Sequence, residues 1–402
     1  MDLTTTILVI LGVVIALIFN FSNGKNNASN AIATVVATHA MTPQQALIFA
    51  AICCLIGPFV FSTAVANTIV NGVVNPSIFT PSLLLVGLCG SILWVNFCSY
   101  MGIPVSSSHA LVGGVLGAGI AKGGFSSVLW PSGETLVYTL LFILAGVAVG
   151  FVIALILALI FQEKLSVFLI RGSATGSVFG ILACMIAGIL PSGEILAIFL
   201  FICVSPMLGL TVSFTFTAIL TCIINKRLKH PMKMNKWFQH LQVVGAGFQA
   251  LSIGGNDAQN AMGIIFAILV SIHEIPAKAT VPMWVIIISA FAIALGMVCG
   301  GLNIIKRVGS GITRIMPYQG FSASISSGGV LALVTVLGIP VSTTHVASGA
   351  IIGTGITRGV GLVNWKTVIH MVIAWVVTIP CAAVVSGIAY FSIESIFGIL
   401  SI

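Results

Sequence analysis

The amino-acid sequence predicts an all-α polytopic membrane protein made of two homologous repeats. Of its 402 residues, 58% are hydrophobic and 5% are charged, whereas roughly 25% are charged in a soluble domain. Several apolar stretches approach the roughly 20 residues that an α-helix needs to cross a bilayer. Two polar motifs also occur twice, in the same order, in otherwise apolar surroundings. A water-facing surface cannot be built from this composition, so we expect a multi-pass protein of the cell membrane.

The apolar stretches begin near the N-terminus. Residues 3–20 predict a retained first helix, because Asp2 is the only charge before Lys25 and a signal peptide starts with basic residues. None of the stretches alternates as an outer-membrane strand does. With interrupted segments included, we expect about 10–12 membrane-spanning segments, all helical. The clearest stretches are 3–20, 45–61, 83–101, 135–161, 195–224, 282–305 and 367–391.

Internal similarity divides the chain into two halves. Residues 103–123 (IPVSSSHALVGGVLGAGIAKG) and 339–359 (IPVSTTHVASGAIIGTGITRG) are identical at ten of 21 positions without a gap. A second pair of motifs, GKNNASNAIA at 24–33 and GGNDAQNAMG at 254–263, precedes them. The offsets are 339 − 103 = 236 and 254 − 24 = 230. We therefore predict a first repeat over 1–224 and a second over 241–402. The span count is too ambiguous to decide from the residues whether the repeats are parallel or inverted.

The segment 225–240, which joins the halves, is strongly basic. It holds five of the fifteen basic residues: Lys226, Arg227, Lys229, Lys233 and Lys236. Short basic loops stay on the cytoplasmic side of a membrane, so we predict a cytoplasmic loop that contacts lipid headgroups and no nucleic acid. The nine cysteines lie in apolar runs and form no CxxC pair, so we expect neither disulfides nor a bound cofactor.

The first pair of motifs gathers polar side chains that cannot face lipid. Within each motif the two flanking asparagines are four residues apart and share a helix face. Gly24, Gly254 and Gly255 would let the chain unwind there. Oxygen atoms beside unwound carbonyls suit a hard cation such as Na⁺. The candidate cation-binding residues are Asn26, Asn27, Asn30, Asn256, Asp257 and Asn260, of which Asp257 is the one acidic member.

The second pair of motifs predicts an anion site. Each has three hydroxyl residues after Pro-Val and before a short glycine-rich apolar segment, a pattern typical of a re-entrant hairpin or broken helix. Hydroxyl residues cap helix starts, and helix starts bind anions. The triplets are Ser106, Ser107 and Ser108, and Ser342, Thr343 and Thr344. His109 and His345 follow them, and each could donate to the anion or brace the turn.

Other readings of these clusters are weaker. Asparagine and serine often join membrane helices by hydrogen bonds, but four clusters in duplicated order favour a site. An intramembrane enzyme lacks a second acid beside Asp257. A passive channel fits duplicated broken helices less well than alternating access does. Hydroxyls and amides do not by themselves distinguish phosphate from sulfate or another oxyanion.

The four motifs resemble those of the PiT family of inorganic phosphate transporters. GGNDAQNAMG is similar to the second signature of that family, and GKNNASNAIATVVATHA to the first. The resemblance covers both halves. It implies secondary active phosphate uptake coupled to Na⁺ or, in some bacterial members, H⁺. It also implies inverted repeats with re-entrant hairpins, external termini and a homodimer.

The resemblance further implies where the ions bind. Phosphate is expected between the two hydroxyl triplets, with Asn27 and Asp257 beside it, and Na⁺ at the asparagine motifs. One position departs from the family pattern: this chain has Asn27 where the family usually has aspartate. An amide still offers an oxygen atom, but it removes one negative charge from the site, so cation affinity or stoichiometry could differ.

Overall fold

The structure is a computed structural model that describes residues 3–66, 73–161, 165–191, 194–227, 231–276, 279–300 and 311–397. The long helices of the first half are α1 (Leu3–Ala37), α2 (Pro43–Val60), α4 (Pro81–Tyr100), α5 (Ser107–Gly123), α6 (Gly133–Phe161), α7 (Leu165–Ile186) and α8 (Ile195–Arg227). Those of the second half are α9 (Pro231–Ser271), α10 (Met283–Val298), α12 (Pro317–Val336), α13 (Thr343–Ile356) and α14 (Trp365–Phe397). Short 3₁₀ turns lie at Pro76–Ile78, Phe125–Ser127 and Val360–Leu362.

The helices confirm the prediction of an all-α polytopic membrane protein. Within the described ranges, seven helices are long and apolar enough to cross a membrane, and Gly172–Ile186 and Met283–Val298 are shorter apolar helices. Exposed side chains on these helices are largely hydrophobic, for example Ile7, Leu140 and Val376. Lipid rather than water therefore suits the outer surface. The total of 10–12 segments stays a prediction.

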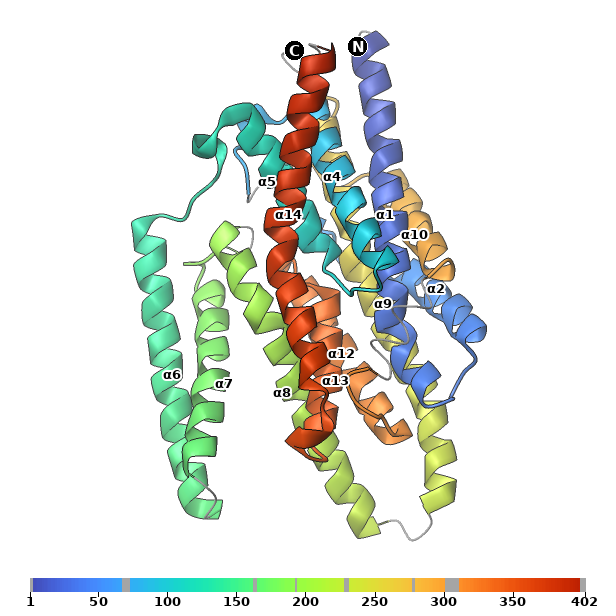
Figure 1. Cartoon of the computed structure of the whole chain (residues 1–402), viewed down its shortest axis with the longest axis vertical. Helices are drawn as coiled ribbons and strands as arrows, with labels where there is room; N and C mark the ends of the chain where they lie inside the picture. The colour runs from blue at the N-terminus through green and yellow to red at the C-terminus, as the bar shows by residue number, and fades with distance from the viewer. Residues whose placement is uncertain are drawn as a thin grey trace.

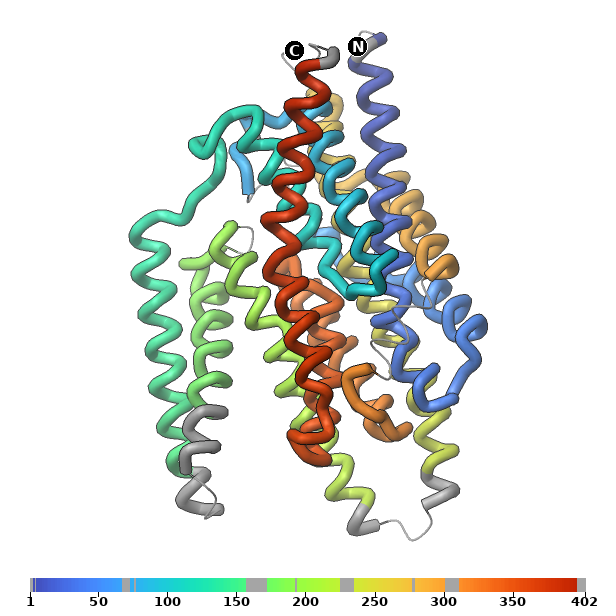
Figure 2. Tube along the Cα trace, viewed as in Figure 1, coloured from blue at the N-terminus to red at the C-terminus, as the bar shows by residue number. Residues whose placement is uncertain are grey.

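Corresponding helices of the two halves run in opposite directions (Figure 1). Helix α1 descends from the N-terminus, whereas α9 ascends from the opposite end of the molecule. Both chain termini lie at one end, and the adjoining ends of α8 and α9 lie at the other (Figures 1 and 2). This arrangement agrees with inverted repeats.

Each half contains a helical hairpin that turns back in the middle of the molecule. Helix α4 ends at Tyr100 and α12 ends at Val336. Each is followed two residues later by a glycine with positive φ, Gly102 at 67° and Gly338 at 68°, a left-handed conformation that glycine adopts without steric cost. Ile-Pro-Val then follows each glycine, and its proline, which has no backbone N–H, does not continue the helix. The two hairpins approach the centre from opposite ends (Figure 1).

The glycines beside the asparagine motifs serve packing, and the prediction that the chain unwinds there is wrong. Helices α1 and α9 are continuous through both motifs. A methyl group at Gly24 would overlap the carbonyl oxygen of Ile293 on α10, and one at Gly254 would overlap that of Cys54 on α2. Small residues at such crossings let helix backbones approach closely in membranes. Gly24 and Gly254 are equivalent residues of the two repeats, and each allows a close helix crossing, α1 with α10 and α9 with α2.

Glycines also seat each hairpin against a long helix of the other half. Methyl groups at Gly113 and Gly117 on α5 would overlap backbone atoms of α14, and those at Gly349 and Gly353 on α13 would overlap backbone atoms of α8. The halves therefore interlock. Helices α6 and α7 pack mainly on each other, and they stand to one side of the bundle (Figure 1).

The basic segment 225–240 is not the loop that the sequence predicted. Helix α8 continues to Arg227 and α9 starts at Pro231, so Lys233 and Lys236 lie on a helix. Lysine and arginine are good helix formers. The sequence prediction relied on hydrophobicity, which does not indicate a helix in a polar, basic segment. Lys229 lies outside the described residues. The cytoplasmic side of this connection stays a prediction.

Replacing Gly254 by alanine should destabilise the α2–α9 crossing, because a packed interior accommodates an added methyl group poorly. We expect a loss of about 1–3 kcal/mol in the free energy of unfolding in detergent. Gly329→Ala on α12 is the matched control, since no atom lies within 4 Å of the added carbon. Equal stability of the two variants would contradict the close crossing.

Candidate functional site

The two asparagine motifs meet where α1 and α9 pack together. The Asn27 amide Nδ2 donates to Asp257 Oδ2 over 2.6 Å. Along α1, Asn27 also donates to Asn23 Oδ1 over 2.6 Å, and Asn30 donates to Asn27 Oδ1 over 3.0 Å. Equivalent positions of the two repeats are therefore direct neighbours.

Each asparagine motif also binds the hydroxyl triplet of the other half. Asn30 Nδ2 donates to Thr344 Oγ1 over 2.8 Å. Asn260 Nδ2 donates to Ser108 Oγ over 3.1 Å. These are the same hydrogen bond in the two repeats, since both residues are shifted by the repeat offset. The four motifs thus form one cluster rather than two separate sites.

The first residues of α5 and α13 face the same cluster. Thr343 Oγ1 donates to Asp257 Oδ2 over 2.8 Å. The Ser107 hydroxyl donates to Asn23 Oδ1. A helix start carries unpaired N–H groups and a partial positive charge. The start of α13 lies beside the Asp257 carboxylate, and the start of α5 lies beside the Asn23 amide. The arrangement can hold ions of both signs.

Two of the predicted anion ligands also cap their helices. Ser106 Oγ accepts from the backbone N–H of His109 over 3.2 Å, and Ser342 Oγ accepts from that of His345 over 3.3 Å. Both residues have extended backbone, as N-cap residues do. Their hydroxyls position the turns that carry Ser107 and Thr343.

Two of the predicted cation ligands hold the hairpins in place. Asn26 Nδ2 donates to the Val105 carbonyl over 2.9 Å, and Asn256 Nδ2 donates to Thr335 Oγ1 over 2.9 Å. One bond reaches the hairpin tip before α5, and the other reaches the end of α12. Asn26 and Asn256 are therefore at the margin of the cluster.

The two histidines form a pair behind the hydroxyl triplets. The ring centroids of His109 and His345 are 5.0 Å apart, edge to face. His345 also stacks on Trp375 of α14 at 4.1 Å, and Trp375 Nε1 donates to the Pro104 carbonyl over 3.2 Å. Among the described residues, neither imidazole has a hydrogen-bond partner for its ring nitrogens.

Two buried oxygen atoms of the cluster have no partner. Asp257 Oδ1 and Asn30 Oδ1 accept no hydrogen bond from any described residue. Buried acceptors are almost always satisfied, so such oxygens mark a place for an ion or water. In the part of the chain that the structure describes, no three His, Cys, Asp or Glu side chains form a metal cluster. Oxygen donors of this kind suit a hard monovalent cation better than a transition metal.

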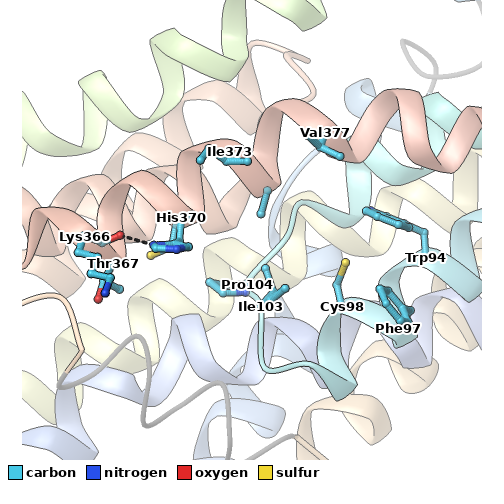
Figure 3. A pocket seen from close by; sticks show the side chains of 12 residues that line it. Trp94, Phe97, Cys98, Ile103, Pro104, Lys366, Thr367, His370, Ile373 and Val377 are labelled. Atoms are coloured by element: carbon cyan, nitrogen blue, oxygen red, sulfur yellow. Dashed lines mark hydrogen bonds between the residues drawn. The ribbon is translucent and has the colours of Figure 1, made fainter.

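The cluster is closed to the outside, and a cavity lies beside the Ile103–Pro104 segment (Figure 3). Every predicted site residue exposes 5% of its surface or less. The cavity, of about 530 Å³, lies between the end of α4 and α14, and Lys366 and His370 are among its lining residues. Ile103 and Pro104 face the cavity, whereas the next carbonyl, that of Val105, accepts from Asn26 and Thr344. One extended segment thus separates the cluster from the cavity.

Comparison with known proteins agrees with this architecture. A model of the phosphate transporter family matches residues 23–386. The "Probable low-affinity inorganic phosphate transporter" of Rhizobium meliloti (strain 1021) is 36% identical over 395 residues, which are 98% of this chain and 99% of the relative. The protein of the same name from Bacillus subtilis (strain 168) is 34% identical over 393 residues, covering 97% and 98%.

The chain belongs to the phosphate transporter family. A solved structure described as "The sodium-dependent phosphate transporter" has the same fold, with a TM-score of 0.68 and 24% identity over 97% of this chain and 100% of that chain. The relatives are named as transporters, in agreement with the expectation that the chain is not an enzyme.

Asn23 and Trp375 belong to the cluster but were not among the site residues predicted from the sequence. Asn23 accepts hydrogen bonds from Asn27 and Ser107. Its signal was present, because Asn20, Asn23, Asn27 and Asn30 follow helical spacing on one face. Trp375 carried no signal, since a tryptophan in an apolar helix is ordinary until its neighbours are known.

A double-mutant cycle should detect the hydrogen bond between the halves. Hydrogen bonds between membrane helices contribute about 0.6 kcal/mol on average and up to about 1.7 kcal/mol. We expect a coupling energy in this range for Asn30→Ala with Thr344→Val, measured from free energies of unfolding. Thr215→Val is the control partner, because Thr215 is exposed and bonds to its own helix. Equal coupling in both cycles would contradict the contact.

Proposed function

We propose that this protein takes up inorganic phosphate together with a cation, by alternating access. The main support is the closed cluster in which the hydroxyl-bearing starts of α5 and α13 contact both asparagine motifs. The family and the names of its relatives support phosphate as the anion. Hydroxyls and helix N-termini are suitable donors for a tetrahedral oxyanion.

In this proposal phosphate lies between the starts of α5 and α13. Ser107, Ser108, Thr343 and Thr344 are its hydroxyl donors, while Ser106 and Ser342 hold the turns. The 5.0 Å separation of the rings of His109 and His345, each next in sequence to its triplet, supports a short distance between these helix starts. Asn27 and Asp257 lie beside the same space.

The coupling ion in this proposal is Na⁺, with H⁺ as the alternative. The unpartnered oxygens Asp257 Oδ1 and Asn30 Oδ1 are the observation that supports a cation. Carboxylate, amide and hydroxyl oxygens are ligands of hard cations. Asn260 on the second motif offers a further amide oxygen. A cation beside the anion lowers the cost of burying either charge.

The opposed hairpins support alternating access. The α4–α5 hairpin and the α12–α13 hairpin reach the centre of the molecule from opposite ends (Figure 1). Movement of one tip would open the cluster to one side only, as transport requires. We place the α8–α9 connection in the cytoplasm, because it is basic, and the termini outside. A homodimer is part of the same proposal.

Purified protein in proteoliposomes should accumulate labelled phosphate when an inward Na⁺ gradient is applied. Uptake driven equally well by a pH gradient without Na⁺ would identify H⁺ as the coupling ion. Absence of uptake under both gradients would contradict symport. Sulfate at tenfold excess should compete weakly, and equal potency of sulfate would indicate a broader oxyanion transporter.

Ser107→Ala and Thr343→Ala should each raise the phosphate concentration that gives half-maximal uptake by about tenfold or more. A hydrogen bond to a charged group contributes about 1.5–3 kcal/mol, and about 1.4 kcal/mol corresponds to a factor of ten. Thr215→Ala removes an exposed hydroxyl of α8 and should leave uptake unchanged. Normal half-saturation in both site variants would place the anion elsewhere.

A further inference from the structure

The two repeats differ in charge at the position where they meet. Asn27 and Asp257 are equivalent residues, since 257 − 27 = 230 is the offset of the asparagine motifs. They are also direct partners, with Asn27 Nδ2 2.6 Å from Asp257 Oδ2. The duplicated position therefore holds one amide and one carboxylate in contact, rather than two groups of the same kind.

Asp257 is an isolated charge. It is fully buried, and it is the one buried Asp, Glu, Lys or Arg among the residues whose side chains the structure describes. Its hydrogen-bonding neighbours are neutral, namely Asn27 and Thr343. With the carboxylate ionised, the protein therefore contributes one negative charge to the closed cluster.

The two carboxylate oxygens have separate surroundings. Oδ2 accepts from Asn27 and Thr343, whereas Oδ1 has no described partner. The Asn27 N–H group thus occupies the place where a cation would have to lie if both positions held carboxylates, because two carboxylates at this distance repel each other. In the present protein, Asp257 Oδ1 is therefore the one carboxylate oxygen of the pair that remains available to bind a cation.

We propose that Asn27 sets the coupling ratio, so that each phosphate enters with one monovalent cation fewer than it would if both repeats carried a carboxylate. The inference rests on the proposed function. A buried charge without a counter-charge is strongly unfavourable, so the loaded cluster binds enough cations to balance phosphate and the fixed carboxylates together. In this proposal the empty cluster opens to water, which solvates the fixed carboxylate in place of the cations, so the cations bound with phosphate are those that are transported.

The coupling ratio can be derived from the Na⁺ or H⁺ gradient at which net labelled phosphate flux stops in proteoliposomes held at a known membrane voltage and phosphate gradient. Asn27→Asp should raise the ratio by one cation per phosphate, whether the added ion is Na⁺ or H⁺. Asp257→Asn should lower it by one. The exchanged variant, Asn27→Asp with Asp257→Asn, keeps one carboxylate and one amide and should retain the ratio of the unmodified protein.

The outcomes separate this inference from the proposed function. Absence of phosphate uptake by the unmodified protein would contradict the function itself. Normal uptake with an unchanged ratio in Asn27→Asp would overturn the inference alone. If Asn27→Asp does not fold, the other two variants test the inference. A changed ratio in the exchanged variant would overturn the inference. An unchanged ratio in Asp257→Asn would overturn it as well.

Discussion

Polar side chains inside an apolar bundle must find partners within the protein, because lipid offers none. In this structure they find them across the boundary between the repeats. Asn30 of the first half contacts Thr344 of the second, Asn260 of the second contacts Ser108 of the first, and Asn27 contacts Asp257. Asn26 and Asn256 bond within their own halves, but Asn27, Asn30 and Asn260 each have a partner in the other half. The need for exchanged hydrogen bonds therefore holds both hairpins and both long helices at one place.

Helix packing and site geometry depend on the same duplicated residues. Gly24 and Gly254 bring α1 and α9 against their neighbours just before the asparagines on the same helices. Gly102 and Gly338 follow the first helix of each hairpin shortly before the hydroxyl triplets. Corresponding helices of the two halves run in opposite directions (Figure 1), and equivalent helix starts approach the centre from opposite ends. In the proposed function, these two like helix ends act on one anion.

The duplication is close in geometry but not in chemistry. The hydrogen bonds of Asn30 and Asn260 and the two serine caps recur in both halves, yet one central position is an amide and the other a carboxylate. The wall around the cluster is unequal too. On one side the extended segment at Pro104, whose carbonyl accepts from Trp375, stands between the cluster and a cavity lined partly by Lys366 and His370.

The sequence by itself determined the membrane class, the two repeats, the helical spans and the candidate polar residues, because hydrophobicity and duplication are local properties of the chain. It misjudged Gly24, Gly254 and the segment 225–240. A glycine beside polar residues can open a helix or admit a neighbouring backbone, and only the partner helix decides which. The tertiary structure alone decided that Asn26, Asn256, Ser106 and Ser342 hold turns and hairpins, that Asn23 and Trp375 join the cluster, and that Asn27 touches Asp257. These contacts join residues far apart in the chain, and their pairing depends on how the helices cross.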